Sequence, residues 1–290
     1  MSTKPISLFL KKYGGMVDSP LLSNVSLAEA LKKAKAKIAT PETLSSLTDS
    51  ERKRSVILVQ DAFTRYFETQ VVSDWIELIS KIGYHIYLAP FSPNGKPLQV
   101  LGFLGAFEKT ARKSSARLSE LDKFGIPLVG LDPAMTLVYR QEYSKLSAEK
   151  PCPMVFLPQE WLAKIFEVGA PVINNFSASQ DPYLLLAHCT EKTNSPASTA
   201  LWQTVFEKFG MNLKVMSTGC CGMSGTYGHE SKNYETSKKI YDLSWQPAVE
   251  KYKTSGKLLA NGYSCRSQVK RFGDVKIRHP LQALLCHMKT

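Results

Sequence analysis

The chain repeats its own pattern of apolar runs and glycines, and this duplication constrains the fold more than any other feature of the sequence. An apolar run at 56–59 is matched 127 residues later by another at 183–186. Further matches follow at the same spacing: Trp75 with Trp202, Gly83 with Gly210, and Gly95 with Gly222. A repeat at a fixed spacing indicates two copies of one structural unit. We therefore expect the 290 residues to contain two similar units.

Each unit alternates short apolar strands with amphipathic helical segments. Second strands are expected at 84–88 and 211–215, and third strands within 125–134 and 256–265. Such alternation is typical of parallel sheets flanked by helices. The predicted fold class is α/β, with two pseudo-repeated β-α-β units whose parallel sheets are flanked by helices, plus an N-terminal helical segment.

Four cysteines lie at the expected strand ends of the second unit. Cys189 follows its first strand, Cys220 and Cys221 follow its second, and Cys265 follows its last. The carboxyl ends of parallel strands share one edge of a sheet, where α/β proteins bind ligands. We therefore expect the four thiols to meet and to ligate a metal centre. Thiolate is a preferred ligand of both zinc and iron–sulfur clusters, so the residue type leaves these two open.

The first unit carries no cysteine at the corresponding positions. They hold Ala62, Pro93, Asn94 and Ala134. The fold therefore does not require thiols there, which argues against cysteines that merely fill the core. An alternative is a thiol–disulfide enzyme that uses Cys220 and Cys221. Against it, adjacent cysteines form a strained ring, and the sequence has no CxxC motif.

Two neighbours of the cysteines belong to the predicted site. Gly222 would allow the sharp turn by which adjacent thiols face one centre. His188 would ligate or hydrogen-bond the centre from beside Cys189. Cys152 and Cys286 have no such placement and are expected in the apolar core. No residue is assigned a catalytic role, because no nucleophile-elbow motif frames the serine and histidine residues.

The net charge and the composition limit the kinds of partner and the cellular location that we expect. The formal net charge is +12, but the basic clusters are short and carry no interleaved aromatic residues. We expect no nucleic-acid partner and a solvated basic surface, with an acidic partner or an anionic membrane face as alternatives. No membrane-length apolar run or secretory signal is present. The expected location is cytoplasmic, with peripheral contact on the inner face of the cytoplasmic membrane as an alternative.

Four short motifs resemble a known family of cysteine-rich domains. They are HCTEKT at 188–193, GCCGMSGTYGHE at 219–230, GYSCRSQ at 262–268 and RHPLQALL at 278–285. They resemble the CCG domains of heterodisulfide reductase and of glycerol-3-phosphate and glycolate oxidase iron–sulfur subunits. Three further segments restrict the resemblance to a narrower group of proteins: GGMVDSPLLS at 14–23, DAFTRY at 61–66 and LDPAMTLVYRQEY at 131–143. With them, the chain looks like the C-terminal portion of bacterial FAD-linked D-2-hydroxyacid dehydrogenases of the D-lactate or D-2-hydroxyglutarate type.

The resemblance implies a [4Fe–4S] cluster, with zinc as the alternative. The family's ligands fall on Cys189, Cys220, Cys221 and Cys265. The chain departs from the broader pattern at Gly262, where a final CxxC would supply a fifth cysteine. FAD is expected only on a missing domain or partner, so the chain would not be catalytic alone.

The implied function is electron transfer from that flavin-containing domain or subunit to an acceptor such as the quinone pool. The alternative is a structural zinc-binding docking domain without redox activity. The domain expectations are as follows: 1–50 an N-terminal helical extension with helix caps Ser26 and Thr40 or Thr43, 51–143 a first CCG-like repeat that has lost its ligands, 144–182 a connecting segment, and 183–290 a second CCG repeat with the cysteine site.

Overall fold

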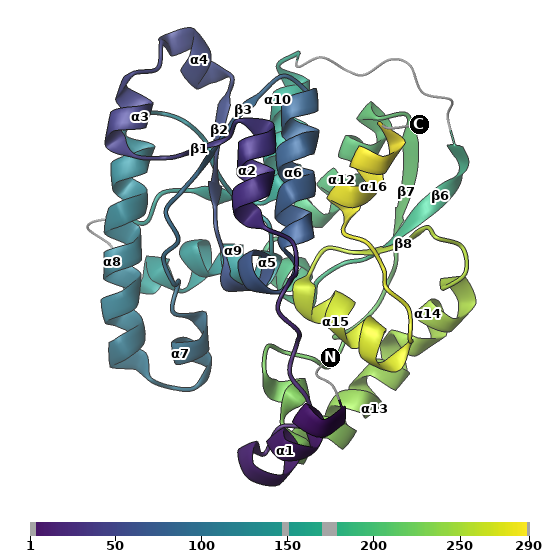
Figure 1. Ribbon diagram of the computed structural model, residues 1–290. Helices are drawn as coiled ribbons and strands as arrows, with labels where there is room; N and C mark the ends of the chain where they lie inside the picture. The colour runs from purple at the N-terminus through teal and green to yellow at the C-terminus, as the bar shows by residue number, and fades with distance from the viewer. Residues whose placement is uncertain (1–3, 147–150, 170–178, 289–290) are drawn as a thin grey trace.

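Two parallel β-sheets organise the chain, one in each half (Figure 1). The structure is a computed structural model that describes residues 4–146, 151–169 and 179–288. The first sheet contains β1 (Lys37–Ile38), β2 (Ser55–Val59), β3 (His85–Leu88), β4 (Leu128–Gly130) and β5 (Val155–Phe156). The second contains β6 (Ser179–Leu186), β7 (Met211–Val215) and β8 (Leu258–Ala260). All pairings between these strands are parallel, which confirms the predicted α/β fold.

Helices flank both sheets. Those of the first half are α1 (Lys4–Gly14), α2 (Leu27–Ala34), α3 (Pro41–Ser45), α4 (Asp49–Lys53), α5 (Ala62–Tyr66), α6 (Thr69–Lys81), α7 (Lys96–Val100), α8 (Leu104–Asp122), α9 (Pro133–Gln141) and the 3-10 helix η1 (Tyr143–Lys145). Those that follow are α10 (Pro158–Glu167), α11 (Cys189–Asn194), α12 (Pro196–Lys208), η2 (Tyr227–His229), η3 (Ser231–Asn233), α13 (Tyr234–Ser244), α14 (Gln246–Tyr252), α15 (Tyr263–Phe272) and α16 (Pro280–His287).

The strand orders reproduce the duplication seen in the sequence. The first sheet runs β1-β3-β2-β4-β5 and the second β7-β6-β8, so the first strand of each repeat lies between its second and third. Trp75 of α6 and Trp202 of α12 are both fully buried. Gly83 and Gly210, which follow these helices, have φ of +84° and +66°. This left-handed conformation favours glycine, so the two matched glycines end equivalent helices.

The N-terminal extension is partly helical and partly an edge of the first sheet. Ser26 caps α2 by accepting the backbone N–H of Glu29 at 3.3 Å, and Thr40 caps α3 in a reciprocal pair with Thr43. Between the two helices, β1 pairs with β3. The predicted caps therefore form, with Thr40 rather than Thr43 at the start of α3, and the extension adds a strand that was not expected.

The segment between the repeats also joins the first sheet. Its strand β5 pairs with β4, and the expected amphipathic helix is α10. Residues 147–150 and 170–178 of the predicted connecting segment lie outside the described residues. Both edge strands of the first sheet, β1 and β5, thus come from segments outside the predicted repeat 51–143.

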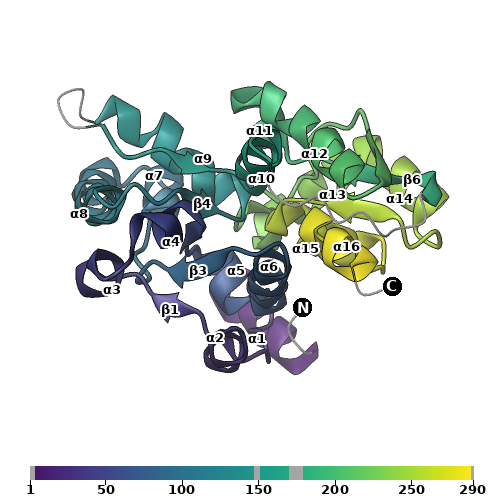
Figure 2. The same cartoon turned by 90° about the horizontal axis from the view of Figure 1, so that it is seen from above.

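The two halves share one apolar core. Helix α6 of the first repeat packs against α16, and α10, from the segment between the repeats, packs against α12; these helices lie between the two sheets (Figure 2). Trp75, Trp161 and Trp202 all lie in this cluster, and the rings of Trp75 and Trp161 meet edge to face with centroids 5.7 Å apart. The sheet of the second repeat therefore packs against an apolar core that contains residues of both repeats. Within the described residues, no helix combines the length and apolarity that crossing a membrane requires.

Candidate metal centre

Cys189 begins a short helix at the end of the central strand of the second sheet. It is the first residue of α11, and the buried side chain of His188 caps that helix by accepting the N–H of Thr190 at Nδ1 over 3.1 Å. The equivalent position of the first repeat holds Asp61, which caps α5 in the same way. His188 therefore positions Cys189 through the helix start, because Nδ1 is engaged in the cap. Burial is the main cause that lowers the pKa of His188.

Cys220 and Cys221 occupy the loop that follows β7. Gly222 comes next, with φ of +85°, and a Cβ there would lie 2.3 Å from the carbonyl oxygen of Ser237. Glycine is therefore required by both conformation and space. The N–H of Gly222 donates to Cys220 Sγ at 3.3 Å, and the carbonyl of Gly222 accepts from Ser237 Oγ at 2.8 Å. The predicted sharp turn at Gly222 is present and directs one backbone donor at a thiol.

Cys265 lies in the first turn of α15, directly after β8. It is buried, as is Cys221, whereas Cys189 and Cys220 are half-buried. The residues that follow the three strands of the second sheet thus include two buried thiols and two half-buried thiols. This arrangement places one side of the group in the protein interior and the other toward its surface.

The four thiols contact one another in sequence. Cys189 Sγ lies 3.9 Å from Cys220 Sγ. Cys221 also interacts with both Cys220 and Cys265. These interactions between thiols hold the pKa of Cys220 well below its usual range and raise the pKa of Cys189 and of Cys221. The four thiols therefore interact as one group.

The thiols of this group suit a thiolate-bound centre in their chemistry, and one pair of them has the required spacing. The 3.9 Å between Cys189 Sγ and Cys220 Sγ is close to the roughly 3.8 Å between two thiolates on one tetrahedral ion with 2.3 Å bonds. Within the described residues, no three His, Cys, Asp or Glu side chains are disposed so that they could hold a metal ion. Each thiol interacts with the next one along the row rather than with all the others. Binding a metal ion would therefore require the cysteine side chains to change rotamer so that their sulfur atoms face a common centre.

Gly262 explains the departure from the final CxxC of the broader CCG pattern. A Cβ at position 262 would lie only 2.1 Å from Cδ2 of His188. The backbone of Gly262 is ordinary extended chain, with φ of −92°, so space alone selects glycine. The His188 ring thus occupies the room that a cysteine at 262 would need, and a fifth thiol has no place beside the other four.

A buried polar network behind the site was not predicted from the sequence. Glu191 of α11 is fully buried and accepts from Gln159 Nε2 at 2.6 Å and from Ser198 Oγ at 2.9 Å. Asn261 donates to the same carboxylate and accepts the backbone N–H of His188 at 2.9 Å. Burial raises the pKa of Glu191 to about 7. The only signal in the sequence was that Glu191 lies within the motif at 188–193 and that Asn261 directly precedes the motif at 262–268.

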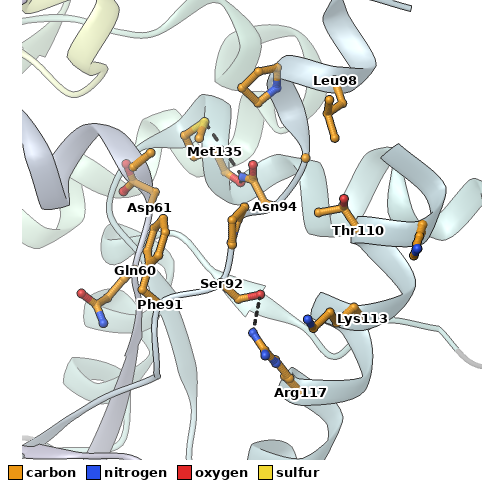
Figure 3. A pocket seen from close by; sticks show the side chains of 15 residues that line it. Gln60, Asp61, Phe91, Ser92, Asn94, Leu98, Thr110, Lys113, Arg117 and Met135 are labelled. Atoms are coloured by element: carbon orange, nitrogen blue, oxygen red, sulfur yellow. Dashed lines mark hydrogen bonds between the residues drawn. The ribbon is translucent and has the colours of Figure 1, made fainter. Parts of the chain in front are cut away.

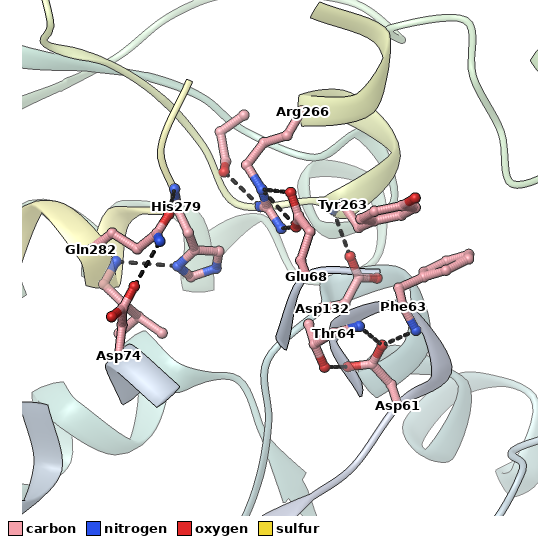
Figure 4. Close-up of polar contacts among 12 residues, drawn as sticks. Asp61, Phe63, Thr64, Glu68, Asp74, Asp132, Tyr263, Arg266, His279 and Gln282 are labelled. Atoms are coloured by element: carbon pink, nitrogen blue, oxygen red, sulfur yellow. Dashed lines mark hydrogen bonds and ion pairs between the residues drawn. The ribbon is translucent and has the colours of Figure 1, made fainter. Parts of the chain in front are cut away.

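Contacts from the first repeat fix the helix that carries Cys265 (Figure 4). Asp132 Oδ2 accepts the backbone N–H of Tyr263, the first residue of α15, at 2.8 Å. The buried guanidinium of Arg266 donates to both carboxylate oxygens of Glu68 and to the carbonyl of Ala260. Asp132 and Glu68 belong to the first repeat, so contacts from the first repeat hold the start of α15, the helix that carries Cys265.

The remaining cysteines lie away from the group. Cys152 is half-buried against the outer core of the first repeat, where burial raises its pKa to about 11. Cys286 of α16 is exposed. The expectation of a core position is therefore wrong for Cys286, which lies on a helix face that does not pack.

Several known proteins with similar sequences are named as dehydrogenases. The chain is 51% identical over 285 residues to D-2-hydroxyglutarate dehydrogenase of Pseudomonas putida, and 46% identical over 276 residues to that of Escherichia coli K12. Over nearly its whole length, the chain is similar to D-2-hydroxyglutarate dehydrogenases. These matches cover 98% and 95% of the chain but only 27% of each relative. The chain thus spans about a quarter of the length of the relatives it matches.

A more distant likeness covers 81% of the chain. It is 22% identical over 243 residues to one of the subunits of the anaerobic glycerol-3-phosphate dehydrogenase of Escherichia coli K12, and 59% of that relative is matched. No family model matches the chain. Among solved structures, a hypothetical protein from Helicobacter pylori aligns with a TM-score of 0.45 at 11% identity, over 100% of this chain and 55% of that one. The sequence relatives therefore associate the chain with dehydrogenases.

Proposed function

We propose that this chain is the iron–sulfur electron-transfer portion of a FAD-linked D-2-hydroxyacid dehydrogenase acting on D-2-hydroxyglutarate or D-lactate. The observation that carries the proposal is the row of four thiols at the strand ends of the second repeat. The relatives named D-2-hydroxyglutarate dehydrogenase support the reaction class. In this proposal, a flavin-containing domain or subunit supplies electrons, and an acceptor such as the quinone pool receives them.

Cys189, Cys220, Cys221 and Cys265 would hold the cluster, which supplies one-electron transfer when it is bound. The chain's own residues prepare the site. The N–H of Gly222 donates to Cys220 Sγ, and the charge of the buried Arg266 guanidinium interacts with Cys265. Donors and positive charge near thiolate sulfur favour the reduced state. Burial of Cys221 and Cys265 keeps water from the inner side of the site.

The test is metal and sulfide analysis of the chain purified or reconstituted without oxygen. We expect a brown protein with about four irons and four sulfides per chain, whose visible absorption bleaches on reduction. Cys221→Ser should lose the metal, because it removes a buried ligand that contacts two others. Cys286→Ser is the matched control, since Cys286 is exposed and outside the group, and it should retain the full complement.

A second candidate is a structural zinc site in a docking domain without redox activity. The observation that favours it is the 3.9 Å separation of Cys189 Sγ and Cys220 Sγ, which suits two thiolates on one ion. A colourless protein with one tightly bound zinc, lost in Cys221→Ser but kept in Cys286→Ser, would replace the iron–sulfur proposal with this one.

A further inference from the structure

The first repeat contains a cavity at the place that corresponds to the cysteine site of the second (Figure 3). Its volume is about 550 Å³, which is within the range of small-molecule sites. Three of its lining residues, Ala62, Pro93 and Asn94, correspond to Cys189, Cys220 and Cys221. The strand ends that present thiols in one repeat therefore open onto a cavity in the other.

One wall of the cavity is mostly apolar. It is lined by Phe91, Leu98 and Met135. Asn94 is buried among them, but its amide is already engaged: Nδ2 donates to the carbonyl of Met135 at 3.0 Å, and Oδ1 accepts the N–H of Lys96 at 3.1 Å. This wall offers no free polar group at Asn94 and suits the apolar body of a ligand.

The opposite wall is a row of cations on α8. Lys109, Lys113 and Arg117 are spaced four residues apart and share one face of the helix. Figure 3 shows Lys113 and Arg117 projecting from α8 toward the strand-end loops, where Arg117 Nη1 donates to Ser92 Oγ at 3.1 Å. Within the described part of the chain, neither Lys109 nor Lys113 has an ion-pair partner. Three basic groups in a row attract an anion.

Asp61, the acidic side chain that lines the cavity, opposes this attraction only weakly. Its Oδ1 accepts the N–H groups of Phe63 and Thr64 at 2.8 and 2.9 Å, and its Oδ2 lies 2.6 Å from Thr64 Oγ1. Burial, together with the charge of Asp132, raises the pKa of Asp61 to about 7. The carboxyl oxygens are engaged by the start of their own helix α5 and face away from the cations of α8.

We propose that this cavity binds an amphipathic organic anion. Its apolar body lies against Phe91, Leu98 and Met135, and its carboxylate or sulfonate contacts the cations of α8. An adjoining cavity of about 420 Å³ shares Gln60, Phe91, Ser92 and Arg117 with it, so the site has room for an elongated body. The proposal is independent of the metal centre, because no ligand cysteine lines either cavity.

The test uses 8-anilinonaphthalene-1-sulfonate, an amphipathic anion whose fluorescence rises in apolar surroundings, titrated into this chain. We expect saturable binding of one molecule per chain. Lys113→Glu should weaken binding about tenfold, which corresponds to about 1.4 kcal/mol. Lys208→Glu is the matched control, because Lys208 is an exposed lysine at the end of α12 and lines neither cavity, and it should bind as the unaltered chain does.

Competition identifies the ligand chemistry. Decanoate should displace the probe, whereas sulfate at the same concentration should not, because sulfate lacks an apolar body. Thr110→Trp, which fills the cavity from α8, should abolish binding, and Cys221→Ser should leave it unchanged. Unaltered affinity in Lys113→Glu with a cooperative melt would overturn the proposal. Displacement by sulfate as effective as that by decanoate would also overturn it, since it would indicate a site for bare anions.

Discussion

Gly262 and His188 show at the scale of single residues how this site excludes a fifth thiol. The His188 ring occupies the volume that any side chain at 262 would enter, with 2.1 Å from the added Cβ to Cδ2. We expect Gly262→Ala to lower the unfolding free energy by about 1–3 kcal/mol, because the ring must move and the cap of α11 weakens. Denaturant unfolding measures this change.

Gly105→Ala provides the control for that substitution. Gly105 lies within α8, and a Cβ there would meet nothing within 4 Å. Alanine at this position should leave stability unchanged or raise it by about 0.5–1 kcal/mol. If both variants had the stability of the unaltered chain, His188 would not be packed against position 262.

Asp61 should make stability depend on pH. Its ordinary pKa is near 3.8, and burial and the charge of Asp132 raise it to about 7 in the folded chain. Between these values the native state keeps a proton that the unfolded chain has lost, so its contribution to stability falls as the pH rises from 4 through 7. Asp61→Asn retains the cap and removes this titration.

The difference between the two proteins reports the Asp61 carboxyl together with its electrostatic interaction with Asp132, because other buried acids and histidines titrate in both. We expect Asp61→Asn to match the unaltered chain near pH 4 and to exceed it above pH 7 by about 1–3 kcal/mol. Unfolding curves across the pH range measure the difference. A constant offset at every pH would mean that the carboxyl at position 61 ionises as it does in water.

At the scale of helices and strands, the duplication was predictable because its signals are local. Apolar runs of strand length, helix-ending glycines and buried tryptophans recur at one spacing, and each has the same conformation in both repeats, as Gly83 and Gly210 illustrate. The meeting of the cysteines followed from topology alone, since parallel strands end at one edge. Both predictions required no knowledge of side-chain packing.

Elements formed by pairing between distant segments were not predictable. The two-residue strands β1 and β5 are too short to show a period and exist only because β3 and β4 present free edges. The network around Glu191 was missed for a related reason. Its partners Gln159 and Asn261 are remote in sequence, Ser198 belongs to the next helix, and nothing local to a glutamate reveals that it will be fully buried.

At the scale of the whole molecule, the shared core should make the two repeats unfold together. Leu281 of α16 is fully buried in the cluster that joins both halves and packs toward α6 of the first repeat. We expect Leu281→Ala to cost about 2–5 kcal/mol. Because the core is common, the loss should reach both sheets. Hydrogen exchange on the amides of β2 and β6 measures it, and both should lose protection by the same free energy. Loss confined to β6 would mean that the first repeat is stable without the second, and that its stability does not depend on the half that carries the four thiols.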